Sequence, residues 1–388
     1  MTAITVTLLL AGALGNAALV QKPAKPEVPA FWIRPGYKVE VAAELPRARF
    51  MEFGDDGTLY VSRDSTRDIV AFRDKDRDGF YETQDVFVAG KTQVAGMAFE
   101  GGWLWYTQSG AIWKARDTNK DGKSDEDVVV IPEGQLPSGG GHWWRPIAVT
   151  ADHIYTGIGD ASNFSEPGET ERQQIFRYNK DGSGKTPWSS GHRNSEKLRM
   201  RPGATELWGV DHGSDDFGRE LGESKAKQPV SDTNPPDEFN RYDQGKFYGH
   251  PWVPGFGVPR YEYAEKPDLL DIAARTVLPQ WNFESHSAAN AFTFLAGRKH
   301  FPADHTGDAF VATRGSGGRS PKVGCSVERV LFDKETGRPY GQLRIVGCMK
   351  DNAFLARPVD CVEAPDGTVL FSDDHGGRIY RIRYVGKK

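Results

Sequence analysis

The sequence predicts an all-β protein, a six-bladed β-propeller, and three observations lead to this prediction. One β-strand pattern recurs six times: an apolar strand, a DG or GG turn, an aromatic-rich strand and a later strand ending in basic residues. The copies lie about fifty residues apart, with one interval near a hundred, which fits four-stranded blades plus one insertion. Glycine is plentiful at 44 residues, and long stretches at helical spacing are scarce.

The blades follow one another along the chain in this repeat. The predicted second strands are GTLYVS, GWLWYT, HIYTGIG, ELWGVD, DAFVAT and GTVLFS. The predicted third strands are DIVAFR, AIWKAR, QIFRYN, EFNRY, VERVLF and RIYRIR. Each small twisted sheet cannot bury both faces alone, so the units must stack around an axis. An open β-sandwich is the competing fold, but it predicts irregular strands rather than one repeated pattern.

The long interval predicts a loop insertion in the fourth to fifth blade region. It runs from about Leu221 to Gln280 and is rich in Pro, Gly and aromatic residues. Such a composition is typical of ordered connecting loops, and we expect them to cover one face of the propeller.

The N-terminus predicts export. Residues 1–20 are an apolar stretch too short for a comfortable membrane span, with small residues around Gly15 and Ala17 that suit signal cleavage. We therefore expect a signal peptide at 1–20, a propeller domain at 21–388, a periplasmic or secreted protein, and no membrane span in the mature chain. An uncleaved anchor or a misplaced start codon is the alternative, because the first residues carry no Lys or Arg.

Charge and cysteine content narrow the function classes. The formal net charge is −4 and no Lys/Arg stripe runs along the chain, so nucleic acid is not expected as a partner. The three cysteines, Cys325, Cys348 and Cys361, permit one disulfide and one unpaired thiol. The chain has no G-x-S-x-G elbow, P-loop, dinucleotide-binding glycine motif or H-E-x-x-H pair, so the sequence gives little support to hydrolysis by a protein nucleophile.

Polar residues at strand ends are the first candidates for chemistry. In a propeller the loops at one end of the channel converge, so residues far apart in sequence meet there. Arg193 and Asn194 precede one strand, and His212 and Gly213 follow the next. Arg357 lies at a strand entrance, where a cation could hold an anionic ligand; an exposed charge closing the last blade is the alternative.

A second candidate is the stretch GGGHWWRP. His142 suits proton abstraction from a hydroxyl group, and the faces of Trp143 and Trp144 suit stacking on sugar rings. The alternative is that His142 bonds a neighbouring backbone group and the two tryptophans fill gaps between blades.

Two acidic loops resemble the first half of a calcium-binding loop. They contain Asp74, Asp76, Asp78 and Gly79, then Asp117, Asn119, Asp121 and Gly122. The twelfth position, where a bidentate glutamate is expected, holds Asp85 in the first loop and Val128 in the second. These loops are interpreted either as structural ion sites or as solvated turns.

Four stretches together resemble the soluble glucose and L-sorbosone dehydrogenase family, which uses pyrroloquinoline quinone (PQQ). They are GHRNSEKLRMRPGATELWGVDHGSDDFG, PPDEFNRYDQGKFYGHPW, GDAFVATRGSGGR and RPVDCVEAPDGTVLFSDDHGGRIYRIRY. The resemblance covers nearly the whole chain after the signal segment. It implies an exported six-bladed propeller that binds PQQ and calcium, oxidises an aldose or a sugar-derived aldehyde, and passes electrons to an acceptor such as a quinone or a cytochrome.

The resemblance also implies roles for particular residues. His142 looks like the general base, and Arg193 and Asn194 look like the pair that contacts the reactive carbonyl region of the cofactor. The remaining implied roles are His212 as a cofactor contact, the backbone carbonyls of Gly213 and Ser214 as calcium ligands, and Arg314 and Arg357 as cations for the PQQ carboxylates.

Two other functions fit the same architecture. A calcium-dependent six-bladed lactonase would need acidic or amide side chains that converge on the axis. A non-catalytic propeller that binds a carbohydrate or a protein is the second alternative.

Overall fold

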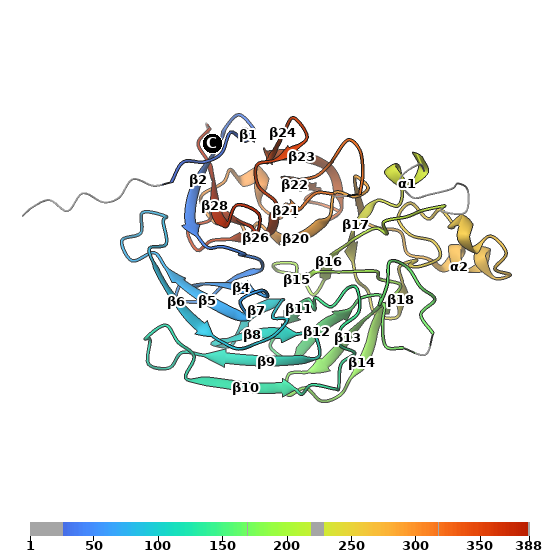
Figure 1. Ribbon diagram of the computed structural model, residues 1–388, viewed down its shortest axis with the longest axis horizontal. Coiled ribbons are helices and arrows are strands. Elements are labelled where there is room, and N and C mark those ends of the chain that lie inside the picture. The colour runs from blue at the N-terminus through green and yellow to red at the C-terminus, as the bar shows by residue number, and fades with distance from the viewer. Residues whose placement is uncertain (1–25, 169, 219–228, 317, 387–388) are drawn as a thin grey trace, which may run out of the picture.

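The computed structural model describes residues 26–168, 170–218, 229–316 and 318–386, and it has the predicted architecture. Six antiparallel sheets stand around a central axis, and Figure 1 looks down the ring. The predicted signal segment, residues 1–20, lies outside the described residues. No helix within the described ranges is long and apolar enough to cross a membrane.

Each blade has four principal strands, which follow one another from the axis outward. Blade 1 contains β3 (Met51–Phe53), β4 (Leu59–Arg63), β5 (Asp68–Arg73) and β6 (Thr83–Val88). Blade 2 contains β7 (Met97–Glu100), β8 (Trp103–Gln108), β9 (Ala111–Arg116) and β10 (Glu126–Ile131). Blade 3 contains β11 (Ile147–Val149), β12 (His153–Ile158), β13 (Gln174–Asn179) and β14 (Thr186–Ser190).

The second half of the ring repeats the pattern. Blade 4 contains β15 (Lys197–Met200), β16 (Leu207–Asp211), β17 (Asp237–Arg241) and β19 (Trp281–Phe283). Blade 5 contains β20 (Ala289–Phe294), β21 (Ala309–Thr313), β22 (Ser326–Phe332) and β23 (Pro339–Gly347). Blade 6 contains β26 (Pro358–Glu363), β27 (Val369–Asp373), β28 (Arg378–Tyr384) and β2 (Tyr37–Glu44). All twelve predicted second and third strands are present.

The N-terminal segment closes the ring, a feature that the repeat did not predict. Strand β2 pairs with the C-terminal strand β28 as the outer strand of blade 6. Strand β1 (Trp32–Ile33) pairs with β23 at the edge of blade 5. A small hairpin, β24 (Met349–Lys350) with β25 (Ala353–Phe354), lies between blades 5 and 6. Pairing of both ends of the chain removes edges that would otherwise stay open.

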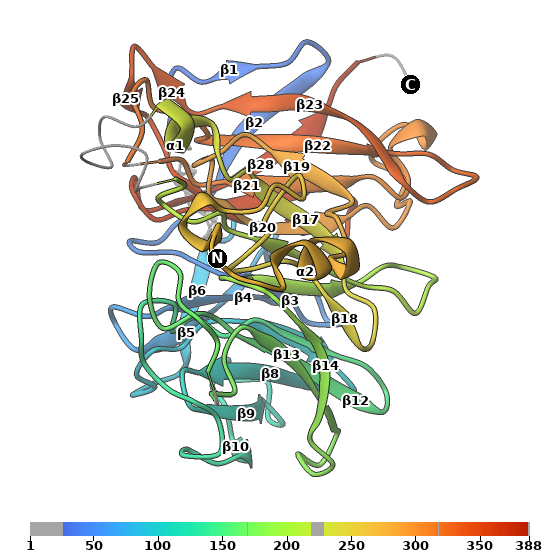
Figure 2. The same cartoon turned by 90° about the vertical axis from the view of Figure 1, so that its right-hand side faces the viewer.

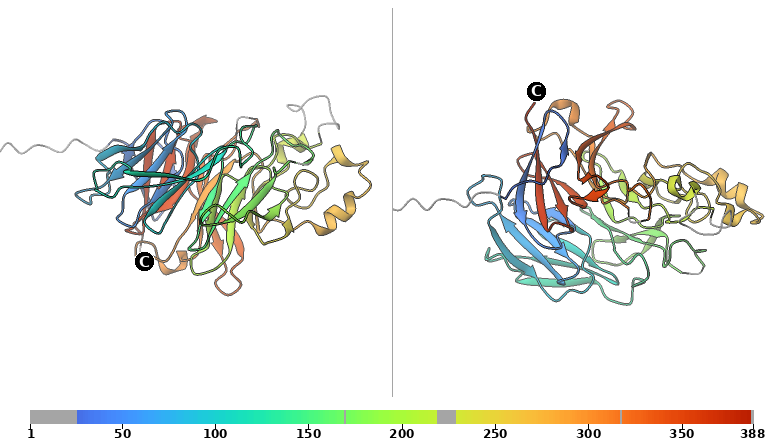
Figure 3. Two further views of the ribbon diagram at one scale, coloured as in Figure 1. Left: turned by 90° about the horizontal axis from the view of Figure 1, so that it is seen from below. Right: turned by 45° about the horizontal axis from the view of Figure 1, so that its top comes forward.

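The insertion is not one run of loops, because β17 divides it as the third strand of blade 4. Beyond β17, β18 (Lys246–Phe247) pairs in parallel with β14 of blade 3. The helices α1 (Pro229–Thr233) and α2 (Leu269–Arg275) lie outside the ring, as Figures 2 and 3 show. Two short 3₁₀ turns, η3 (Tyr261–Tyr263) and η4 (Ala303–His305), complete the helical elements of the described chain.

The core lies between neighbouring blades, where each sheet buries its faces against the next. Phe239 of blade 4 contacts Phe292 of blade 5 at a ring-centroid distance of 4.8 Å, and Trp208 contacts Phe332 at 5.3 Å. These side chains are 0–2% exposed. The alternating apolar residues of one blade therefore become stable only when the next blade covers them.

Buried ion pairs block the axis. Lys197 of blade 4 reaches across the ring, where its Nζ lies 2.9 Å from Asp360 Oδ2 of blade 6 and 3.2 Å from the Met51 carbonyl of blade 1. Lys197 and Asp360 are fully buried. The two ends of the axis are therefore separate surfaces.

Strand direction decides which loops share an end. Because neighbouring strands are antiparallel, the segments that enter the innermost strands and those that leave the second strands lie at the same end of the ring. His142, Arg193 and Arg357 precede innermost strands, whereas His212 and Arg314 follow second strands. We call this the site end. The acidic loops join third and fourth strands and lie at the opposite end.

Candidate functional site

His142 is held in one tautomer by a backbone carbonyl. Its Nδ1 lies 2.9 Å from the Asp160 carbonyl oxygen, which can only accept, so Nδ1 carries the proton and Nε2 is the basic nitrogen. Burial, and secondarily the charge of Arg193, lowers the pKa of His142 to about 3. The imidazole is therefore neutral at physiological pH and able to accept a proton at Nε2.

The same segment holds His142 against Arg193. The amide of Asp160 donates to the Arg193 carbonyl at 2.8 Å, and a Cβ on Gly159 would lie 2.8 Å from His142 Cβ. Glycine is therefore required at 159 for this close approach. The Asp160 carboxylate accepts a hydrogen bond from His250 Nε2 at 2.8 Å, which holds its pKa below the usual range although burial raises it. Asp160 thus orients His142 through its backbone and not through its carboxylate.

Arg193 is a buried cation whose side chain has neutral partners. Its Nε donates to the Asn163 carbonyl at 2.7 Å and its Nη2 to Asn163 Oδ1 at 2.9 Å. The residue is 6% exposed, burial lowers its pKa, and no ion pair joins its guanidinium to a carboxylate within the described ranges. The nearby carboxylates of Asp215, Asp211 and Asp237 partly offset the cost of burying this charge, and an anionic ligand that accepts hydrogen bonds from the guanidinium would offset it further.

Asn194 and His212 form the next part of the site. Asn194 Nδ2 donates to His212 Nδ1 at 3.2 Å, so the ring proton of His212 is on Nε2. His212 Nε2 and Asn194 Oδ1 are both buried and have no hydrogen-bond partner in the part of the chain that the structure describes. Asp211 fixes the pair to Arg193, because its carboxylate accepts the backbone amides of Arg193 at 2.9 Å and Asn194 at 2.5 Å.

Arg193 and His212 line a cavity of about 140 Å³, whereas His142 and Asn194 lie outside its wall. Its wall contains Arg193, His212, Gly213, Asp237 and the segment around Gly315. The Gly213 amide donates to Asp237 Oδ1 at 2.8 Å, and a Cβ at Gly213 would lie 2.7 Å from a backbone oxygen of Pro235. Only glycine allows the backbone this close to the wall.

Ser214, the second predicted calcium ligand, is fixed through its side chain. Its hydroxyl accepts from Arg260 Nη1 at 2.6 Å and donates to the Asp216 carbonyl at 2.7 Å. The role of the two backbone carbonyls remains a prediction. Asp215 and Asp237 also line the cavity, and carboxylate oxygens suit calcium, although those of Asp237 already accept hydrogen bonds from Gly213, Ser287 and Ala289.

Arg314 and Arg357 lie close together at the site end. Arg357 Nε donates to the Arg314 carbonyl at 3.2 Å and Nη2 to the Gly315 carbonyl at 2.8 Å. Arg314 Nη2 instead forms an ion pair of 2.9 Å with Asp374. Since Gly315 also lines the cavity, Arg357 contacts one residue of the cavity wall.

The two tryptophans stack on one another. The Trp143 and Trp144 rings are 4.3 Å apart at an interplanar angle of 22°, and both are half-buried against the core between blades. The guanidinium of Arg49 lies 5.2 Å from the Trp144 ring. Part of each ring therefore fills a gap between blades, as the alternative interpretation stated, while their contact with sugar remains a prediction.

The comparisons with known proteins bear on this site. A family model described as a domain of unknown function, DUF7133, matches residues 24–315. The chain belongs to the DUF7133 family. This DUF7133 chain is 24% identical to an uncharacterized protein of Borreliella burgdorferi over 368 residues, which cover 90% of this chain and 89% of that protein.

Solved structures share the fold of this DUF7133 chain. The calcium structure of a Trichoderma reesei carbohydrate-active enzyme of family AA12 has a TM-score of 0.78 at 18% identity, and the match covers 93% of this chain and 99% of that one. The holo form of the pyranose dehydrogenase PQQ domain from Coprinopsis cinerea has a TM-score of 0.76 at 16% identity, with 92% and 98% covered. At these identities the likeness establishes the six-bladed fold.

Sequence reasoning missed several residues of the site. Asn163, which holds the Arg193 guanidinium, lies in a loop without a recognisable motif. The sequence did contain a signal for Arg49. In three other blades an arginine also stands shortly before the innermost strand, at positions 145, 193 and 357. Arg49 Nη1 donates to Asp374 Oδ2 at 2.9 Å and Nη2 to Glu196 Oε2 at 3.3 Å across the ring, and thus forms part of the site floor.

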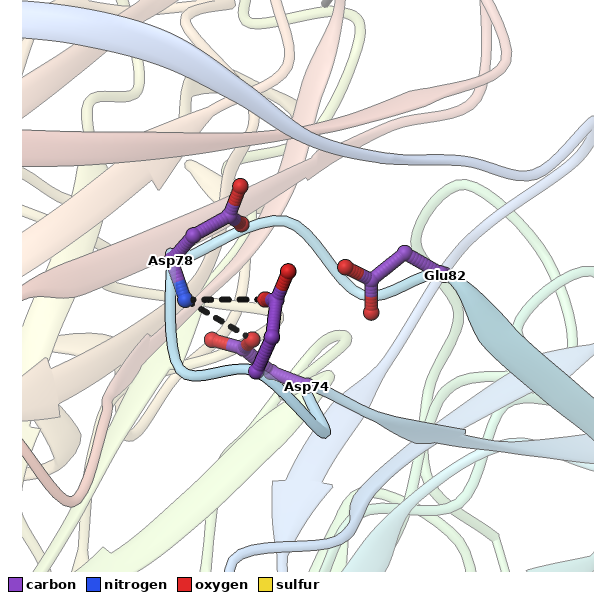
Figure 4. A group of neighbouring side chains, drawn as sticks. Asp74, Asp78 and Glu82 are labelled. Carbon is purple, nitrogen blue, oxygen red and sulfur yellow. Dashed lines mark hydrogen bonds between the residues drawn. The ribbon is translucent and has the colours of Figure 1, made fainter. Parts of the chain in front are cut away.

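The first acidic loop lies away from the site and does bring carboxylates together. Oxygens of Asp74, Asp76, Asp78 and Glu82 lie within 4.8 Å of one another, and Figure 4 shows this group with Asp74, Asp78 and Glu82 labelled. The twelfth residue, Asp85, takes no part and lies 3.3 Å from Arg73.

The second acidic loop binds its own backbone. Asp117 accepts the Gly122 amide at 2.8 Å, and Asn119 Nδ2 donates to Asp125 Oδ1 at 2.8 Å. Asp121 accepts the Lys123 amide at 2.8 Å. These contacts are those of a solvated turn.

All three cysteines are free thiols. Cys325, Cys348 and Cys361 are fully buried, and burial raises the pKa of each. The single disulfide that the cysteine count allowed is not formed.

Proposed function

We propose that this protein is a PQQ- and calcium-dependent oxidoreductase that oxidises a sugar or a sugar-derived aldehyde and passes the electrons to a quinone or a cytochrome. The observation that carries the proposal is Arg193, a buried cation with neutral partners that lines a cavity beside the unpaired Nε2 of His212. The names of the fold neighbours, a pyranose dehydrogenase PQQ domain among them, support the same chemistry.

The residues present fit PQQ, an ortho-quinone with three carboxylates. A ligand rich in anionic and carbonyl oxygens would accept hydrogen bonds from His212 Nε2 and the Arg193 guanidinium, which satisfies a buried donor and a buried charge together. Arg314 and Arg357 would hold carboxylates at the rim of the site.

Calcium would bind beside the cofactor. The carbonyls of Gly213 and Ser214 would supply ligands, with the carboxylates of the same cavity wall as further oxygen donors.

The chain's own residues then have separate tasks. When bound, PQQ supplies a two-electron hydride acceptor. His142 accepts the proton of the substrate hydroxyl at Nε2, while the Asp160 carbonyl keeps its ring in the required orientation. Arg193 stabilises negative charge that develops on the oxygen facing it, and Asn163 keeps the guanidinium in place. Trp143 and Trp144 would provide an apolar surface for the sugar ring.

The lactonase alternative receives less support. It needs carboxylates open to a metal on the axis, but Asp360 lies 2.9 Å from Lys197, and Glu52 lies 3.1 Å from Arg199. These carboxylates bind cations of the chain itself. An exported location, periplasmic or secreted, remains part of the proposal because a sugar dehydrogenase of this kind would act on external substrates.

The test is a titration of purified, calcium-loaded apoprotein with PQQ, followed by quinone absorbance, and then addition of a panel of aldoses with an artificial electron acceptor. We expect saturable binding and sugar-dependent bleaching of the acceptor. Absence of PQQ binding would contradict the proposal and favour a non-catalytic carbohydrate- or protein-binding propeller, unless metal-dependent ring opening of a lactone were observed.

A further inference from the structure

A buried arginine of the insertion reaches the loops of the candidate site. Arg260 directly precedes η3, and its amide donates to the Trp252 carbonyl at 2.8 Å. Its side chain is fully enclosed, and Glu262 is its counter-ion at 3.0 Å. A buried ion pair adds little net stability, because the loss of hydration offsets the attraction. The contacts of Arg260 therefore matter more for the geometry that they fix.

Arg260 holds the loop that follows β16. Its Nη1 donates to the Ser214 hydroxyl at 2.6 Å, and its Nη2 donates to the Asp216 carbonyl at 2.7 Å. The Ser214 hydroxyl donates to the same carbonyl at 2.7 Å. Because a guanidinium is planar and rigid, donors on its two nitrogens fix the position of Ser214 relative to Asp216.

Arg260 also contacts the loop that follows β12. Its guanidinium lies 3.8 Å from the ring centroid of Phe164 and 5.3 Å from that of Phe217. Phe164 is the neighbour of Asn163, which accepts two hydrogen bonds from the guanidinium of Arg193. One insertion residue thus touches both of the loops that surround Arg193.

The orientation of the Asn163 amide group depends on the loop that Arg260 holds. Asn163 Nδ2 donates to Asp216 Oδ2 at 3.1 Å, while Asn163 Oδ1 accepts the Asp215 amide at 2.8 Å and Arg193 Nη2 at 2.9 Å. An asparagine side chain has an acceptor on one side and a donor on the other, so a flip would turn its NH₂ group towards the Arg193 guanidinium. The contacts with Asp215 and Asp216 oppose this flip.

We propose that Arg260 is a positioning residue of the site. It keeps Ser214 and Asp216 in place, so that the Asn163 oxygen stays on the Arg193 guanidinium. The insertion thus sets the direction of the cation that faces the cofactor, and the inference rests on the proposed function for this consequence in binding. Arg260 itself lies outside the wall of the cavity.

The experiment uses two substitutions of Arg260. Arg260→Met keeps the length of the side chain and removes its charge and donors, whereas Arg260→Lys keeps the charge without the planar fork. The matched control is Arg329→Met, because Arg329 is also buried and forms an ion pair of 2.6 Å with Asp308. Arg329 donates to the Asp304 carbonyl in η4, which joins an innermost strand to a second strand and therefore lies at the end opposite the site. Thermal unfolding shows whether each variant is folded.

The first measurement needs no cofactor. NMR spectra of protein with ¹⁵N-labelled arginine report how fast the guanidinium protons of Arg193 exchange with solvent, and an Arg193→Met variant assigns their signals. We expect exchange at least about tenfold faster in Arg260→Met, faster by a smaller factor in Arg260→Lys, and unchanged in Arg329→Met. Unchanged exchange in both Arg260 variants would overturn the proposal. If Arg260→Met does not fold, Arg260→Lys decides by itself.

The second measurement is the affinity of calcium-loaded protein for PQQ, followed by quinone absorbance. It should fall at least about tenfold in Arg260→Met and stay at the wild-type value in Arg329→Met. Asn163→Ala should also lower the affinity, and the double variant with Arg260→Met should lower it little further, because both changes act on the same contact with Arg193. Fully additive losses would overturn a role through Asn163.

Failure of the proposed function gives a different result. If the wild type does not take up PQQ, that function is wrong, and the exchange of the Arg193 protons still decides whether Arg260 positions this cation. If the wild type takes up PQQ and a folded Arg260→Met protein binds it equally well, the proposed function stands and the inference about Arg260 is wrong.

Discussion

Asp211 and Glu238 lie opposite one another in the neighbouring strands β16 and β17, and both carboxyl groups are buried directly behind the candidate site. Asp211 receives the backbone amides of Arg193 and Asn194, whereas Glu238 accepts Asn240 Nδ2 at 2.8 Å and the Gly255 amide at 2.7 Å. Burial, and then the nearby Asp211 carboxylate, raises the pKa of Glu238 to about 8.

This pair predicts a pH dependence of stability. A glutamate whose pKa is raised in the folded state stabilises the fold below its unfolded pKa, about 4.5, and this contribution is lost as pH rises towards 8. We therefore expect the melting temperature of the wild type to fall between pH 5 and 8 relative to that of Glu238→Gln. Thermal unfolding of both proteins across this pH range measures the difference in melting temperature. If the two melting temperatures change with pH in the same way, the pKa of Glu238 is not raised.

Replacement of Arg193 by methionine should weaken PQQ binding without a matching loss of protein stability. Methionine has a similar length and removes the cost of burying a charge, but it also removes the donors to Asn163, so the melting temperature should change little. PQQ affinity should fall at least about tenfold, because a charge-assisted contact is lost. Calorimetry and thermal unfolding measure the two effects. Unchanged turnover in a folded Arg193→Met protein would show that the site lies elsewhere.

Replacement of His142 by alanine should leave PQQ binding intact and reduce the oxidation rate by about 10² to 10⁴, the usual contribution of a general base. Dye reduction at saturating substrate measures the rate, and quinone absorbance measures cofactor uptake. Normal oxidation by the variant would remove His142 from the mechanism.

The protonation state of His142 gives an independent test. Because burial and the Arg193 charge lower its pKa to about 3, the imidazole should stay neutral from pH 8 down to about pH 4. NMR spectra of protein with ¹⁵N-labelled histidine, assigned with a His142→Gln variant, would show this. A protonation midpoint between pH 6 and 7 for that imidazole would contradict the buried geometry.

The cysteines should be unreactive in the folded protein. All three thiols are buried, and burial raises the pKa of Cys325 to about 11. A thiol reagent should therefore label almost no cysteine in the native protein. After unfolding without a reductant, it should label all three cysteines. Labelling of a single thiol after unfolding would indicate a disulfide between the other two.

The sequence by itself determined the repeat and the end of the ring at which its candidate residues lie. The six blades follow from local turns and strand alternation, which each stretch of about fifty residues carries on its own. The same local pattern places Arg193, Asn194, His212 and Arg357 at strand ends, the resemblance adds Arg314, and antiparallel strands bring those ends together.

Only the tertiary structure decided which polar atoms meet. Asn163 binds Arg193, the Asp160 backbone orients His142, and β2 closes the ring on β28 across more than three hundred residues of sequence. None of these contacts follows from spacing along the chain, because each depends on how two loops or two distant strands pack around a common axis. The first acidic loop shows the same limit, since the sequence pattern found no glutamate at the twelfth position, whereas the folded turn brings Glu82 to the other carboxylates.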